Sequence, residues 1–343
     1  MPPFLPGVEL ARLFYAEAVR PLLGDLPHAA ARIGPGSDVL GYDSPRSTDH
    51  DWGPRLELFL APGADGDSVS QRLRDELPKR FRDWPTHFEP PGARVRSMAD
   101  TDGPVDHYVK VAEFGAWCRQ WLGFDARAGV TVKQWLATPW QRFAEVTGGA
   151  VFHDDFGELT ATRRRLRWYP DDVWRYVLAC QWTRIAQEEA FVGRTAEAGD
   201  ELGSRLVTAR LSREVARLLL LLGRVWPPYE KWLGSAVRTD PAARHLLVAL
   251  RAGDVDGREA GLCAAYEAAG ERQNALGLAA AVLATCRPYF DRPFLVIGAD
   301  RFAQALIARI TDPQLREAPL TGAVSQFVDS TDALMTVPNT YLG

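Results

Sequence analysis

Two aspartates, separated by one residue, follow a glycine–serine turn in the N-terminal third of the chain. Asp49 and Asp51 come after Gly36 and Ser37, and the apolar run 56–60 follows them. Alternate side chains of an extended segment point the same way, so we expect both carboxylates on one face. A pair of carboxylates can bind Mg²⁺, a hard cation that prefers oxygen ligands. Two such ions would stabilise the attacking and leaving oxygens of a displacement at phosphorus.

The turn before the aspartates has a composition that suits phosphate. Its backbone N–H groups and the Ser37 hydroxyl could form a small anion-binding nest. Gly36 would allow phosphate oxygens to approach the backbone closely, because it has no Cβ atom. The sequence therefore predicts a site for nucleotide phosphates with two Mg²⁺ ions, in which Asp49 and Asp51 are the metal ligands.

Gly36–Ser37 followed by Asp49-x-Asp51 resembles the signature of the DNA polymerase β-like nucleotidyltransferase superfamily. Nearly the whole chain also resembles an uncharacterised family catalogued as domain of unknown function 4037. Four runs carry this second resemblance: STDHDWGPRL (47–56), GGAVFHD (148–154), YPDDVW (169–174) and QEEAFVGR (187–194). The superfamily resemblance implies a nucleoside triphosphate donor, a mixed sheet, a helical domain closing over the nucleotide, and a third carboxylate on a neighbouring strand.

Two residues are candidates for the third carboxylate. In the segment 106–111, alternating valines predict a strand whose other face carries Asp106, Tyr108 and Lys110. If the catalytic acids lie on that face, Asp106 is the best candidate and Lys110 could contact a phosphate. Glu57, inside the apolar strand, is the alternative.

A polar stripe on the helix predicted over 171–190 has two interpretations. Arg184 and Glu188 are one turn apart, so they could form an ion pair worth less than about 0.5 kcal/mol. In the functional interpretation, Glu188 or Glu189 accepts the proton of an attacking hydroxyl. Arg184 or Arg194 would then hold a phosphate. The sequence leaves both interpretations open.

Lys231 and the histidines also have a structural interpretation beside a functional one. Lys231, in a turn with Trp232, could clamp a phosphate or extend along the surface. His50, His107 and His153 could suggest zinc, but no pair has the spacing of two ligands on one helix, which favours structural roles.

The periodicity of apolar residues predicts an α+β protein with two domains. A nucleotidyltransferase-like catalytic domain with a mixed β-sheet and helices is expected over 1–130, followed by an all-helical C-terminal domain over 131–343. Helices are expected over 7–23, 68–81, 114–122, 171–190, 200–224, 257–269, 271–285 and 301–310, with a weak helical signal over 324–327, and strands over 29–33, 56–60, 94–98 and 107–111.

The composition restricts the partners of the protein. The chain has 343 residues, a formal net charge of −4 and a pI near 5.9. Domains that bind nucleic acid along an extended surface usually have a pI above about 9, so no such surface is expected.

The apolar run 215–226 contains two arginines, which argues against a membrane span. Four scattered cysteines and the lack of a signal-like N-terminus favour a cytoplasmic protein with reduced thiols. No feature of the sequence indicates the oligomeric state.

Together these features predict a magnesium-dependent nucleotidyltransferase. It would transfer a nucleoside monophosphate from a nucleoside triphosphate, with ATP the expected donor, to a hydroxyl or similar acceptor of a small molecule. One alternative is a nucleotide-binding or regulatory protein without turnover. Another is a toxin-like nucleotidyltransferase that modifies RNA or protein.

Overall fold

The computed structural model describes residues 2–89 and 95–336 and divides into two compact units. Unit 1 consists of Met1–Val130 and Arg142–Arg167, and unit 2 of Thr131–Gln141 and Trp168–Gly343. The boundary differs from the one expected at residue 130, because the chain returns to unit 1 for the segment 142–167. This segment contains a strand that the sequence pattern did not predict.

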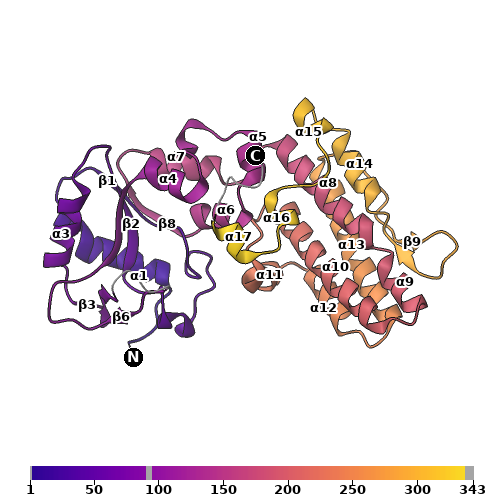
Figure 1. The fold of residues 1–343 in the computed structure, drawn as a ribbon, viewed down its shortest axis with the longest axis horizontal. Coiled ribbons are helices and arrows are strands. Elements are labelled where there is room, and N and C mark those ends of the chain that lie inside the picture. Colours follow the sequence, from indigo (N-terminus) through magenta and orange to yellow (C-terminus); the bar gives the residue numbers. More distant parts are fainter. Residues whose placement is uncertain (1, 90–94, 337–343) are drawn as a thin grey trace. The chain divides into compact units, whose positions relative to one another are not determined.

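Unit 1 is built on a four-stranded mixed sheet (Figure 1). Its strands, in spatial order, are β7 (Tyr108–Glu113), β2 (Arg55–Leu60), β1 (His28–Arg32) and β8 (Ala150–Asp154). Strand β1 is antiparallel to both of its neighbours, and β2 is parallel to β7. The mixed sheet agrees with the α+β prediction, whereas β8 is the unpredicted strand.

The two faces of β2 have different surroundings. Leu56, Leu58 and Leu60 point into a core shared with helices α1 (Gly7–Phe14) and α3 (Gly66–Glu76). Period-two alternation places Arg55, Glu57 and Phe59 on the opposite face. There the Phe59 ring packs against Phe114 and Trp117 of helix α4 (Phe114–Leu122). All six strand residues are buried, so the two charged residues of β2 must find partners inside the protein.

The N-terminal helices largely follow the predictions. The helix expected over 7–23 is continuous as α1, a π-helical segment, Tyr15–Val19, and α2 (Arg20–Leu23). Helix α3 ends at Glu76, earlier than expected. Leu77 is extended because Pro78 follows it, and a residue before proline disfavours the helical conformation.

Helix α4 has the predicted bounds, because both of its ends are defined by local residues. The Glu113 carboxylate caps the first turn by accepting N–H bonds from Gly115 and Ala116. Gly123 ends the helix in a left-handed conformation. The strand predicted over 94–98 begins outside the described residues, and the paired segment there is β6 (Met98–Ala99). The other elements here are η2 (Pro45–Asp49), β3 (Arg80–Phe81), β4 (Trp84–Pro85), β5 (His87–Phe88), η3 (Ala126–Ala128), α6 (Trp140–Thr147) and α7 (Glu158–Arg165).

Unit 2 is mostly helical (Figure 1). Its helices are α5 (Val132–Ala137), α8 (Asp171–Glu188), α9 (Phe191–Glu197), α10 (Glu201–Leu222), α11 (Glu230–Val237), α12 (Ala243–Arg251), α13 (Val255–Leu276), α14 (Asp300–Ile307), α15 (Pro313–Glu317), α16 (Val324–Phe327) and α17 (Thr331–Thr336). The expectation of an all-helical domain over 131–343 is wrong in two places: strand β8 lies within that range, and the short strands β9 (Arg287–Pro288) and β10 (Leu295–Val296) pair with each other.

The helices expected over 257–269 and 271–285 are one helix, α13, which ends at Leu276. Gly270, the residue between the two expected ranges, lies inside this helix. A Cβ atom there would come within 2.7 Å of the Phe302 ring, so the glycine permits close packing on α14. None of the helices in the described ranges is long and apolar enough to cross a membrane.

The core of unit 2 contains a carboxylate surrounded by arginines. Glu214 of α10 has a side chain that is 1% exposed, and its oxygens accept hydrogen bonds from Gln181, Arg184 and Arg213. Burial alone would raise the pKa of Glu214, but the nearby guanidinium groups, with Arg217 the largest contributor, lower it to about 2. The ionised carboxylate therefore stabilises the folded state.

We expect this carboxylate to make unit 2 sensitive to acid. Because the pKa is lower in the folded state than its ordinary value of 4.5, the stabilisation is complete above about pH 4.5 and is lost as the pH falls toward 2. Glu214→Gln should lower the free energy of unfolding by about 3 kcal/mol at pH 7. It should also flatten the pH dependence below pH 4.5. Urea unfolding followed by circular dichroism checks both effects, with the helix-surface variant Asp256→Asn as the control. A Gln variant as stable as the parent at pH 7 would contradict the assignment.

Candidate functional site

Asp51 lies in the loop before strand β2 and is held firmly. Its backbone is left-handed, with φ of +45°, a conformation that aspartate tolerates better than most residues. Its N–H donates to the Arg96 carbonyl over 2.7 Å, and the Arg96 N–H donates to Asp51 Oδ1 over 3.2 Å. The Tyr108 hydroxyl donates to the same Oδ1 over 3.2 Å. Three hydrogen bonds thus fix Asp51 beside strand β7.

Asp49 is held much less firmly. It is the last residue of the 3-10 helix η2 (Pro45–Asp49), its side chain is 55% exposed, and Oδ1 lies 3.0 Å from His50 Nδ1. The prediction of an extended segment is therefore wrong. Asp49 ends a helical turn, His50 is extended, and Asp51 has a left-handed backbone. A proline in the first turn and a capping box from Ser44 favour the helical turn. Strand alternation thus gives no reason for the two carboxylates to share a face.

A buried ion cluster closes the turn that contains Gly36. Arg32 Nε donates to Asp38 Oδ2 over 2.7 Å, and Arg55 Nη2 donates to Asp38 Oδ1 over 3.1 Å. Both arginines also donate to the Pro35 carbonyl, over 2.6 and 3.2 Å. Burial would raise the pKa of Asp38, but the two guanidinium groups hold it below its ordinary value. The cluster therefore remains charged and fixes the turn against the sheet.

Gly36 is required by this cluster. Its φ is +145°, and a Cβ atom would overlap Asp38 Oδ1 and the Nη2 atoms of Arg32 and Arg55. The glycine thus has a structural cause that does not depend on phosphate. Ser37, the next residue, accepts a hydrogen bond from the Tyr42 N–H at its backbone oxygen, over 2.8 Å.

Tyr108 lies among three cations on the polar face of the sheet. The parallel register places Tyr108 beside Arg55 and Lys110 beside Glu57. The guanidinium carbons of Arg55 and Arg96 lie 5.4 and 4.8 Å from the centre of the Tyr108 ring, and Lys110 Nζ lies 5.4 Å from it. The alternation predicted for the segment 106–111 is correct here.

Lys110 differs from the two arginines in having no carboxylate at ion-pair distance among the described residues. Desolvation of its ammonium lowers the pKa of Lys110, an effect that the charge of Glu57 opposes. Desolvation also raises the pKa of Tyr108, and the nearby Asp51 charge acts in the same direction. Tyr108 is therefore a hydrogen-bond donor at neutral pH, and Lys110 is a cation on the same face.

The two candidates for a third carboxylate have other partners. Asp106 precedes β7 and forms ion pairs with Arg74 and Arg96, at 3.3 and 3.5 Å. Glu57 is buried, and its Oε2 accepts the Ile33 N–H over 3.1 Å. Neither residue forms a three-ligand group with Asp49 and Asp51 in the described ranges.

Another group of metal-binding side chains does come together in unit 1. Ligand atoms of His28, His153 and Asp155 all lie within 4.8 Å of one another. The sequence indicated His153 only beside other histidines. His153-x-Asp155, at the end of a strand, was an available signal, whereas His28 lies far away in the chain and only the pairing of β1 with β8 identifies it.

In unit 2, Arg184 and Glu188 do not pair with each other as the structural interpretation expected. Each instead contacts a residue of helix α10. Arg184 Nε lies 3.1 Å from Glu214 Oε2, and Glu188 Oε2 lies 2.7 Å from Arg210 Nε. Both side chains thus have a structural contact inside the unit.

The two other predicted phosphate-binding cations of unit 2 lie against aromatic rings. The Arg194 guanidinium is 5.5 Å from the centre of the Phe191 ring, one turn earlier on α9. Lys231 Nζ is 4.9 Å from the Trp232 ring. These contacts fit the surface interpretation of Lys231.

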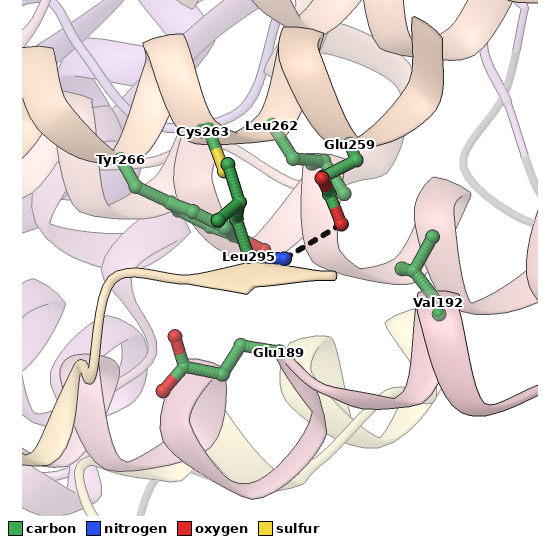
Figure 2. A pocket seen from close by; sticks show the side chains of 8 residues that line it. Glu189, Val192, Glu259, Leu262, Cys263, Tyr266 and Leu295 are labelled. Atoms are coloured by element: carbon green, nitrogen blue, oxygen red, sulfur yellow. Dashed lines mark hydrogen bonds between the residues drawn. The ribbon is translucent and has the colours of Figure 1, made fainter. Parts of the chain in front are cut away.

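Glu189 has a buried structural position. Its carboxylate accepts the N–H groups of Gly298 and Ala299, each over 3.0 Å, just before helix α14. Burial raises the pKa of Glu189, although these hydrogen bonds oppose the shift. Figure 2 shows the small hollow that it lines, where Glu259 accepts the Leu295 N–H over 2.7 Å. The carboxylate is thus engaged by the backbone, which supports a structural role over that of a base.

The comparisons with known proteins identify one similarity. A model of the family described as Domain of unknown function (DUF4037) matches residues 135–233. This range contains three of the four runs that carry the resemblance to that family, and it begins well after the Gly36 turn, Asp49 and Asp51. No curated protein and no solved structure matches the chain.

The Arg32–Asp38–Arg55 cluster was missed by the sequence analysis, although a signal existed. Arg32 and Arg55 both adjoin or lie in apolar strand segments, and a buried arginine requires a carboxylate partner. The spacing alone did not indicate which carboxylate pairs with these two arginines.

The close packing at Gly36 leads to a stability prediction. Gly36→Ala should lower the free energy of unfolding by about 2–4 kcal/mol, since the methyl group displaces buried charged atoms. Gly41→Ala is the matched control: it has a φ of +73° but open space around the Cβ position, so about 1 kcal/mol is expected from backbone strain alone. Chemical denaturation of both variants measures the difference. Equal losses in the two variants would show that the cluster does not constrain the turn.

Proposed function

We propose that unit 1 carries a magnesium-dependent nucleotidyltransferase site centred on Asp51. One observation carries this proposal: an ordered carboxylate and the Lys110 ammonium lie on one sheet face, joined through Tyr108. A carboxylate that can bind Mg²⁺ beside a cation that can bind phosphate is the minimum that a metal–triphosphate complex requires. The resemblance of Gly36–Ser37 and Asp49-x-Asp51 to the nucleotidyltransferase signature supports the same assignment.

The proposed roles differ for the two aspartates. Asp51 is the preformed ligand, because hydrogen bonds from Tyr108 and Arg96 already orient it. The Asp49 carboxylate is exposed and contacts His50, so this side chain can turn toward a metal ion bound by Asp51. Mg²⁺ entry with the nucleotide would then complete the site, with two ions expected.

The reaction is a displacement at the α-phosphorus. An acceptor hydroxyl oxygen forms the new P–O bond, the bond to the β-phosphate oxygen breaks, and pyrophosphate leaves with Mg²⁺. The hydroxyl proton passes to a base or to solvent. ATP is the proposed donor and a small molecule with a hydroxyl or similar group the proposed acceptor. Arg184, Glu188, Arg194 and Lys231 are not needed for this proposal, since each has a structural contact within unit 2.

A second function, nucleotide binding without turnover, is favoured by one observation. Asp106, the best candidate for the third carboxylate, is paired with Arg74 and Arg96. A site with only two acids could hold a metal–nucleotide complex for regulation while lacking the ligand needed for transfer.

Binding of ATP with Mg²⁺, measured by calorimetry, tests the site itself. Asp51→Asn and Lys110→Met should each weaken binding by about tenfold or more, because one removes a metal ligand and the other a phosphate contact. Asp83→Asn and Lys133→Met are matched controls: Asp83, like Asp51, has a left-handed backbone, Lys133 is an exposed lysine, and both variants should bind as the parent does. Equal affinity in the parent, Asp51→Asn and Lys110→Met would exclude the proposed site.

Pyrophosphate release separates the two functions. With ATP, Mg²⁺ and a panel of hydroxyl-bearing small molecules, a transferase releases pyrophosphate, and Asp49→Asn and Asp51→Asn should each reduce the rate by at least about 100-fold. Magnesium-dependent ATP binding without pyrophosphate favours the regulatory protein. Full activity of Asp49→Asn would contradict the role of that residue.

A further inference from the structure

Two histidines and an aspartate gather at the edge of the unit 1 sheet, away from Asp51 on the chain. His28 begins β1, His153 lies on the paired strand β8, and Asp155 follows that strand. The two imidazole rings are 4.6 Å apart between centroids. His153 Nε2 lies 2.8 Å from Asp155 Oδ1, and the backbone N–H of His28 donates to Asp155 Oδ2 over 3.0 Å.

The hydrogen bonds of His28 determine which nitrogen can bind a metal. Its Nδ1 lies 2.7 Å from the Leu26 carbonyl oxygen, which can only accept, so Nδ1 carries the hydrogen. Its Nε2 lies 2.8 Å from the Tyr15 hydroxyl and therefore has a lone pair. A histidine whose other nitrogen donates to a backbone carbonyl has the orientation and tautomer typical of metal ligands.

We propose that His28, His153 and Asp155 form a binding site for a zinc-like divalent metal ion. Imidazole nitrogens and a carboxylate suit Zn²⁺, and three protein ligands leave a fourth position for water. The ion binds His153 Nε2 in place of the hydrogen that this nitrogen shares with Asp155 Oδ1, and that hydrogen moves through solvent to His153 Nδ1, so the bound imidazole keeps one N–H. At His28 the ion replaces the hydrogen bond from Tyr15.

The three ligands require only a small movement to bind zinc. A tetrahedral ion with ligands at about 2.0–2.1 Å holds them about 3.4 Å from one another. The ligand atoms already lie within 4.8 Å of one another. The side chains of His153 and Asp155 are 28% and 41% exposed, so they can rotate and give the ion a path from solvent, while His28 is buried and anchors the site.

The position of the site suggests what the metal does. Strand β8 is an edge strand, and its pairing with β1 is irregular between Ala30 and Ala31. A bound ion would join β8 to the start of β1 beside this irregularity. The metal therefore stabilises the attachment of the segment 142–167 to the sheet of unit 1, a structural function separate from nucleotide chemistry.

Zinc binding by the full chain tests this site. Calorimetric titration of the metal-free protein with zinc chloride should show one ion per chain. Differential scanning calorimetry should show a higher unfolding temperature with zinc. His153→Ala and Asp155→Asn should each weaken binding by about 100-fold and abolish the thermal shift. Both are partly exposed, and circular dichroism checks that they remain folded.

His50→Ala is the matched control, because His50 forms a similar pair with Asp49 but has no second histidine beside it. It should bind zinc as the parent does. The proposal is overturned if the parent binds no zinc, if His153→Ala and Asp155→Asn bind as tightly as the parent, or if His50→Ala is the variant that loses the ion.

Discussion

The buried charge cluster of Arg32, Asp38 and Arg55 is the interaction on which the arrangement of unit 1 depends. Asp38 is 4% exposed and is shared by two guanidinium groups, which also hold the Pro35 carbonyl. Loss of any member would leave an uncompensated buried charge, so the three residues act as one unit. Because the cluster occupies the space beside Gly36, it fixes the path of the chain between β1 and η2.

The same cluster also determines the electrostatics of the polar sheet face. Arg55 is held by Asp38 on one side and lies over the Tyr108 ring on the other. The parallel register of β2 and β7 then sets Lys110 next to Tyr108, whose hydroxyl reaches Asp51. The surroundings of Asp51 are thus produced by two strands and the turn between β1 and β2, and not by the short acidic motif itself. This explains why Asp49, which belongs to the same motif, is so much less constrained than Asp51.

In unit 2, charged residues serve the packing of helices. Glu214 neutralises arginines from α8 and α10, and Glu189 satisfies backbone N–H groups ahead of α14. A charged side chain on an apolar helix must be paired when it is buried, so these residues have a structural reason to be present. The family match over residues 135–233 covers helices α8 and α10 of unit 2 and also strand β8 with His153. The similarity therefore extends over parts of both units and supplies no activity.

The sequence by itself determined the features that depend on neighbouring residues. Helix α4 was predicted with its observed bounds because a capping carboxylate and a terminal glycine adjoin it, and the alternation around Val109 correctly assigned Tyr108 and Lys110 to one face. Only the tertiary structure decided the pairing of β8 with β1, the partners of Asp38, and the meeting of His28 with His153. These contacts join segments far apart in the chain, so no local pattern specifies them. The conformation of the segment 49–51 lies between the two cases: local capping turns it into a helix end, while hydrogen bonds from a distant strand hold Asp51 in place.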